Sequence, residues 1–239
     1  MTNELLLVGS LILIYGMVIV AFRLFGKQGL FMSTIIATIA ANIECLIYIK
    51  AFGMGMTLGN VLFASTFLVT DIASEIYGKK VANKAVKLGI VTTAAFMILS
   101  QYWLLYTPHP TEDFAMPHMK AIFGNIPRIM IASFVVYAVA QTFDVWCYHK
   151  WWAFTEKKFG DKGKFLWVRN NGSTLISQLI NNVLFTVFAF AGIFSTSKLI
   201  MTIVSSYVIF IVTSLGDTPF VYFARWMYGK GKIQKIDEA

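Results

Sequence analysis

The chain has 239 residues, of which 57% are hydrophobic and 13% are charged. Soluble proteins average about 45–50% and about 25% in these two classes. A soluble domain of this size has no core large enough to hide so much apolar surface, so the composition indicates an integral membrane protein. It excludes a disordered chain and a nucleic-acid-binding domain, despite the net charge of +8. The two cysteines, Cys45 and Cys147, fall within apolar runs and exclude a disulfide framework.

Seven apolar runs are each long enough to cross a bilayer as a helix. We predict an all-α integral membrane protein with one polytopic domain, residues 1–239, built as a bundle of about seven transmembrane helices. The third run carries Asp71 and Glu75, so six core helices with a re-entrant third segment is the alternative. The predicted spans are about 4–25, 30–50, 57–77, 86–106, 128–149, 173–195 and 199–224, with a cytoplasmic tail at 226–239.

The basic residues between the spans predict the orientation. If the N-terminus lies outside, 16 of the 20 Lys and Arg residues fall in the inside segments. This asymmetry follows the positive-inside rule and accounts for the high net charge. We therefore expect a multi-pass protein of the bacterial cytoplasmic (inner) membrane, with the N-terminus out and the C-terminus in.

Ionisable and amide side chains recur within four of the spans at a similar distance from the inner helix ends. A carboxylate at the centre of a bilayer costs about 2.5–3.5 kcal/mol on insertion scales, so such residues face protein or water and mark a functional site. Asp71 and Glu75 are four residues apart and share one helix face. The candidate substrate-binding residues are Asp71, Glu75, Asn42, Gln141, Asp144, Gln178, Asn181, Asp217, Tyr137 and Phe185, and the candidates for coupling or gating are Glu44, Arg128 and Arg169.

The chemistry of these side chains suits a polar, planar or cationic small solute. A carboxylate accepts two hydrogen bonds from an N–H edge, carboxamides both donate and accept, and an aromatic ring stacks on a planar face. The three histidines are His109, His118 and His149, and none has the spacing of a metal site. We therefore predict no catalytic residues, no metal ligands and no cofactor, and expect that the protein is not an enzyme.

One stretch is specific enough to support a resemblance. Residues Thr70–Lys80 read TDIASEIYGKK, which resembles the signature of the queuosine precursor transporter family, also called the vitamin uptake transporter (VUT) family. Further family-like pieces follow in the expected order, so the resemblance covers residues 35–225. They are Pro127-Arg128, Gln141 with Asp144-Val145, Arg169-Asn170-Asn171, and Asp217-Thr218-Pro219.

The resemblance implies a fold similar to the substrate-binding components of vitamin importers, working without an ATPase module. It implies a secondary transporter that imports 7-deazaguanines (preQ0, preQ1 or queuine) for queuosine modification of tRNA, with the base and the lipid bilayer as partners and no direct contact with nucleic acid. The chain departs from the family at Asn181-Asn182, where Asp-Thr is usual. If that aspartate pairs with an aminomethyl ammonium or carries a proton, this chain lacks the group, and its substrate preference or its coupling differs from that of the family.

Two other functions stay open at this stage. The chain could be the substrate-binding subunit of an ATP-driven vitamin importer, or a channel or sensor for a small polar solute. Gly55 and Gly59 form a small-xxx-small pair, which suits close helix packing and keeps a homodimer open.

Overall fold

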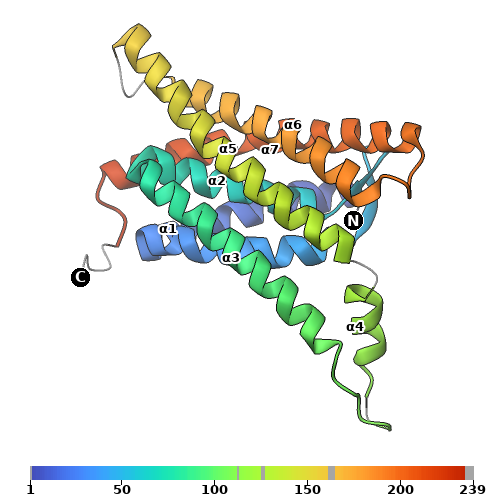
Figure 1. The fold of residues 1–239 in the computed structure, drawn as a ribbon. Coiled ribbons are helices and arrows are strands. Elements are labelled where there is room, and N and C mark those ends of the chain that lie inside the picture. Colours follow the sequence, from blue (N-terminus) through green and yellow to red (C-terminus); the bar gives the residue numbers. More distant parts are fainter. Residues whose placement is uncertain (1, 112, 125–126, 161–164, 235–239) are drawn as a thin grey trace.

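The computed structural model describes residues 2–111, 113–124, 127–160 and 165–234. Over these residues it contains seven helices and one antiparallel strand pair, which confirms the all-α membrane class (Figure 1). Parts of five helices, α1, α3, α5, α6 and α7, are long and apolar enough to cross a membrane. The elements are α1 (Asn3–Glu44), β1 (Tyr48–Ala51), β2 (Met54–Thr57), α2 (Gly59–Tyr77), α3 (Lys79–Trp103), α4 (Met116–Phe123), α5 (Pro127–Phe159), α6 (Leu166–Phe190) and α7 (Thr196–Gly229).

The first helix, α1, consists of two arms that meet at Gly26. This glycine has φ 54° and ψ −132°, a conformation that residues with a Cβ rarely adopt. Beyond it the chain doubles back, so that Gly29 packs directly on the backbone of Ala21. Asn3 Nδ2 donates to the carbonyl oxygen of Lys50 at 2.8 Å, which places the start of the first arm beside the end of the second. The helix therefore supplies two antiparallel segments.

A strand pair replaces the end of the second predicted span. That span was expected to run to residue 50, but α1 ends at Glu44 and β1 begins at Tyr48. The two-residue turn Phe52-Gly53 has φ 51° and 73°, which matches the type I′ turns of β-hairpins. Tyr48, Ile49, Ala51 and Phe52 are apolar or aromatic and continue the apolar run of α1, so the hydropathy of the run did not show where the helix ends.

Other helix ends also differ from the predicted spans. α3 begins at Lys79, seven residues before the predicted start, and α5 continues ten residues past 149. α7 runs to Gly229, so the first residues of the predicted tail at 226–239 are helical. The chain then packs back on α1, where the backbone N–H of Gln234 donates to the carbonyl oxygen of Arg23 at 3.1 Å. Residues 235–239 lie outside the described part.

α2 is the central helix of the bundle. It contacts α1, α3, α5 and α7, and nearly every residue between Val61 and Ser74 is buried. The largest hydrophobic cluster surrounds it and includes Phe22, Leu68 and Ile72. Because neighbouring helices shield α2, it can carry carboxylates that a lipid-facing helix could not. The same polar residues explain why α2 is not among the five apolar helices.

Candidate functional site

A column of polar side chains runs along α2 through the middle of the bundle. We call the end of the bundle at β1 and β2 the hairpin end, and the opposite end, where α2 gives way to Lys79 and Lys80, the basic end (Figure 1). α5 and α7 run in the same direction as α2, and α6 runs in the opposite direction. From Phe63 to Glu75 the helix rises about 18 Å at 1.5 Å per residue, and four groups of side chains occupy this length.

The group nearest the hairpin end lines a small pocket. Asn181 and Phe185 from α6 face Phe63 and the start of α2 there, whereas none of the predicted carboxylates lines this pocket. The pocket has a volume of about 40 Å³, which holds only one or a few water molecules. A purine-sized base therefore fits only if the helices separate. The full lining is Ala41, Cys45, Thr57, Gly59, Asn60, Phe63, Ser133, Asn181, Phe185 and Phe210.

Asn181 and its neighbour Asn182 have different surroundings. Asn181 is on the pocket wall, whereas Asn182 Nδ2 donates to the carbonyl oxygen of Ile203 at 2.6 Å and ties α6 to α7. Of the two positions where this chain departs from the family pattern, only Asn181 therefore lines the pocket.

Amides form the second group. Gln141 Nε2 donates to Thr66 Oγ1 at 2.6 Å, which links α5 to α2. Gln178 from α6 is fully buried, yet neither its Nε2 nor its Oε1 has a hydrogen-bond partner among the described residues. The buried hydroxyl of Tyr137, which packs over Gly89, is also without a partner in this part of the chain. Buried polar groups are normally satisfied, so these atoms point to a ligand-binding role.

The third group contains Asp71, Asp144 and Asp217, which we call the acid layer. These carboxylates come from α2, α5 and α7 and are no more than 1% exposed. Thr174 Oγ1 donates to Asp71 Oδ2 at 3.0 Å, and Asn170 Nδ2 donates to Asp217 Oδ1 at 2.7 Å. Four carboxylate oxygens of the layer have no hydrogen-bond partner among the described residues: Asp71 Oδ1, both carboxylate oxygens of Asp144, and Asp217 Oδ2.

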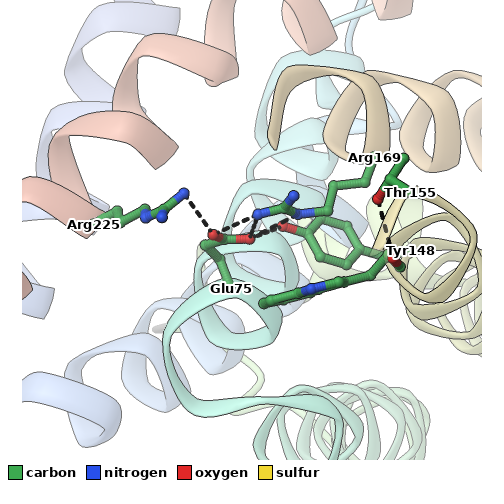
Figure 2. A network of polar contacts seen from close by, with 6 residues as sticks. Glu75, Tyr148, Thr155, Arg169 and Arg225 are labelled. Atoms are coloured by element: carbon green, nitrogen blue, oxygen red, sulfur yellow. Dashed lines mark hydrogen bonds and ion pairs between the residues drawn. The ribbon is translucent and has the colours of Figure 1, made fainter. Parts of the chain in front are cut away.

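A buried ion pair closes the column at the basic end. Arg169 binds Glu75 through Nε at 3.0 Å and through a terminal nitrogen at 2.7 Å to each carboxylate oxygen (Figure 2). Tyr148 donates to Glu75 at 2.7 Å, and Arg225 approaches the same carboxylate at 3.1 Å. We call Glu75, Tyr148, Arg169 and Arg225 the ion-pair cluster; it joins α2, α5, α6 and α7.

The two partners of the central ion pair are buried. The side chain of Arg169 is 0% exposed and that of Glu75 is 3% exposed. The guanidinium also lies over the ring of Trp152, with its carbon 4.4 Å from the ring centre. In this conformation the Glu75 carboxylate is fully engaged by protein donors, so it is not presented to a solute as the sequence predicted. Arg169, predicted as a coupling or gating residue, is its main partner, and a role of Arg169 in coupling or gating stays a prediction.

Three predicted residues are not among the four groups described above. Arg128 donates to the carbonyl oxygens of Phe188 and Ala191 at 2.7 Å, so it caps the end of α6. Asn42 is buried near the hairpin end, where its Nδ2 donates to the carbonyl oxygen of Thr38 at 2.7 Å. Glu44 is the last residue of α1. None of these three lines the pocket.

Sequence reasoning missed Asn170 and Arg225 as site residues. Asn170 holds Asp217, and its own Oδ1 has no partner among the described residues. Its position next to Arg169 in the family-like motif was the available signal. Arg225 was counted only as a basic residue after the last span, and nothing in the sequence links it to Glu75.

The comparisons with known proteins agree with this architecture. The family described as "Putative vitamin uptake transporter" matches residues 57–224. The chain belongs to this family. A relative named "Probable queuosine precursor transporter", from Bacillus subtilis (strain 168), is 34% identical over 210 residues, covering 88% of this chain and 89% of the relative. No solved structure matches the chain. The family match spans α2 through most of α7, and it contains every residue of the acid layer and all of the ion-pair cluster except Arg225, which follows it directly.

Proposed function

We propose that this member of the vitamin uptake transporter family is a secondary transporter that imports queuosine precursors. The substrates are 7-deazaguanine bases such as preQ0 and preQ1, which feed the queuosine modification of tRNA. The membrane is the bacterial cytoplasmic membrane, with the N-terminus and the hairpin end outside. The name of the Bacillus subtilis relative and the shared length of both chains support this assignment.

The observation that carries the proposal is the surplus of buried acceptors along the column. In the acid layer, four carboxylate oxygens have no donor within the described part of the chain, and Asn170 Oδ1 next to them has none either. The guanine-like edge of a 7-deazaguanine presents N–H groups side by side, and each would donate to such an acceptor. The buried amide of Gln178 supplies a donor and an acceptor for the remaining polar atoms of the base.

The path of the solute follows from the two ends of the column. The pocket of Asn181 and Phe185 is near the hairpin end, and the ion-pair cluster closes the basic end. A base that enters at the pocket passes the amides and reaches the acid layer. Release at the basic end requires the bond between Glu75 and Arg169 to break, as expected for alternating access around a fixed site.

The experiment is uptake of radiolabelled preQ0 by the purified protein in liposomes. The proposal is supported if uptake is saturable, is inhibited by unlabelled preQ1 and is not inhibited by adenine. Uptake that rises linearly with concentration would indicate a channel. Uptake that appears only with a separate ATPase would indicate a subunit of an ATP-driven importer.

A further inference from the structure

The charge balance of the acid layer goes beyond substrate binding. Three carboxylates from three helices are buried together, and Asp71 interacts electrostatically with both Asp144 and Asp217. Arg169 is the only basic side chain among the buried residues that the structure describes, and it is bound to Glu75. The layer therefore has no counter-charge of its own among these residues.

Three uncompensated carboxylates cannot all stay ionised in a low-dielectric interior. Burying an isolated charge costs far more than protonating the group, and neighbouring carboxylates raise this cost further. The titratable and charged groups that face the layer from the surrounding helices do not relieve it, since none is a free cation. They are Tyr15 from α1, Glu75 from α2, Cys147 and Tyr148 from α5, and Arg169 from α6.

The three carboxyl groups of the layer differ in how many hydrogen bonds they accept. Asp71 and Asp217 each accept one hydrogen bond, from Thr174 and Asn170, whereas neither oxygen of Asp144 has a partner in the described part of the chain. The hydroxyl groups of Thr70, Ser173 and Ser177 lie within hydrogen-bonding reach of Asp144, but each of them donates to a backbone carbonyl oxygen in this structure. Asp144 is thus the carboxyl best suited to carry a proton.

Two neighbouring amides are a second, independent sign that the layer binds something. The amide of Gln178 is fully buried, follows Thr174 by one helical turn on the same face, and has both polar atoms without a partner among the described residues. Asn170 Oδ1, equally buried, is an acceptor without a donor beside Asp217. A protonated carboxylic acid is a hydrogen-bond donor, so protonation of the layer supplies a donor for these unpartnered acceptors.

We propose that the acid layer is the proton site of the transporter, with Asp144 as the group that binds and releases the co-transported proton. The proton adds to an Asp144 carboxylate oxygen when the layer communicates with the hairpin end, and it leaves to water when the basic end opens. The proton gradient then drives uptake of the base. This inference rests on the proposed transport function. Sodium is the alternative coupling ion, and the test below distinguishes it from the proton.

The test imposes gradients on liposomes that contain the purified protein and measures accumulation of radiolabelled preQ0. With the outside more acidic by about two pH units, one proton per base supports accumulation of up to about 100-fold. A sodium gradient of equal size should produce no accumulation. Asp144→Asn, which is permanently neutral, should lose accumulation. It should retain slower exchange of labelled for unlabelled preQ0, and that exchange should no longer depend on pH.

The matched control is Asp113→Asn. Asp113 lies outside the bundle core and accepts hydrogen bonds from the backbone N–H groups of Ala115 and Met116, a role that asparagine also fills. This variant should accumulate preQ0 as the parent does. Because exchange requires a folded protein that binds the base, it separates loss of coupling in Asp144→Asn from loss of folding.

Three results would overturn the inference. Accumulation driven by sodium and not by protons would reassign the coupling ion. Equilibration of preQ0 without accumulation under any gradient would leave an importer that works by facilitated diffusion. Proton-driven accumulation that persists in Asp144→Asn would move the proton site elsewhere. A complete absence of preQ0 uptake and exchange by the folded parent protein would instead refute the proposed function itself.

Discussion

The ion-pair cluster gives the sharpest prediction about stability, because two arginines bind the same carboxylate in different surroundings. Arg169 is 0% exposed and lies 2.7 Å from Glu75, whereas the side chain of Arg225 is 40% exposed and lies 3.1 Å away. Glu75→Gln leaves the Arg169 guanidinium buried without its counter-charge. Breaking one side of a buried pair costs about 3–5 kcal/mol, whereas an exposed pair contributes about 0–1 kcal/mol.

These energies translate into a difference in thermal stability that can be measured in detergent. For a chain of this size, each kcal/mol shifts the unfolding midpoint by about 2–4 °C. Glu75→Gln should therefore lower the midpoint by about 6–20 °C. Arg225→Gln is the matched control, because it removes the exposed partner of Glu75 and keeps the buried one, and it should lower the midpoint by less than about 4 °C.

The same two variants test whether the cluster closes the basic end. Ser74 is buried one residue before Glu75, so a cysteine introduced there reports opening of the column. In a background without Cys45 and Cys147, Ser74→Cys should react with a membrane-impermeant maleimide faster when Glu75 is also changed to Gln. Arg225→Gln should leave the rate within about twofold, because an exposed pair contributes little. Equal melting points and equal labelling rates for the two variants would refute this account of the cluster.

Three further predictions concern other parts of the column and the fold. Gln178→Leu should abolish preQ0 uptake and leave the unfolding midpoint unchanged or slightly raised, because a buried amide without a partner among the described residues adds nothing to stability. A large loss of stability would show that the amide is hydrogen-bonded within the protein. Asn181→Asp should shift the substrate preference from neutral preQ0 toward cationic preQ1 by about tenfold or more, since a charge-assisted hydrogen bond is worth about 1.5–3 kcal/mol. Competition between the two bases for uptake measures this preference, and an unchanged preference would place the exocyclic group elsewhere. Gly26→Ala should destabilise the fold by at least about 1–2 kcal/mol, because φ is 54° at the reversal of α1. Thermal unfolding measures this loss against Gly9→Ala as the control, and equal midpoints for the two variants would contradict the prediction.

Much of the membrane architecture could be predicted from the sequence, because the hydrophobic effect leaves a strong pattern there. Apolar runs of the right length foretold a multi-helix membrane bundle. The spacing of Asp71 and Glu75 placed both carboxylates on one helix face, and the distance of Asp144 and Asp217 from the inner helix ends placed them at a similar depth. All of these arguments depend on periods and lengths within single helices, which local sequence encodes.

The missed features depend on contacts between distant residues or on conformations that composition does not reveal. Glu75 and Arg169 are 94 residues apart, and no spacing rule joins them. The reversal at Gly26 depends on one backbone conformation, and glycine there was equally consistent with a simple loop. Of the strand pair at 48–57, residues 48–50 were predicted as the end of one span and residues 51–56 as the connection to the next, because so short an apolar run does not distinguish a strand from a helix end.

The central claim is that this chain imports 7-deazaguanines, and one measurement in cells tests it most directly. The cells cannot synthesise preQ0 and lack their own importer, and they express this protein at a level verified in the membrane. They are fed low concentrations of preQ0, preQ1 or queuine separately, and queuosine is then measured in their tRNA. The account predicts that queuosine returns with preQ0 and is lost again in Gln178→Leu. No queuosine with any of the three bases, with the protein present in the membrane, would contradict the claim.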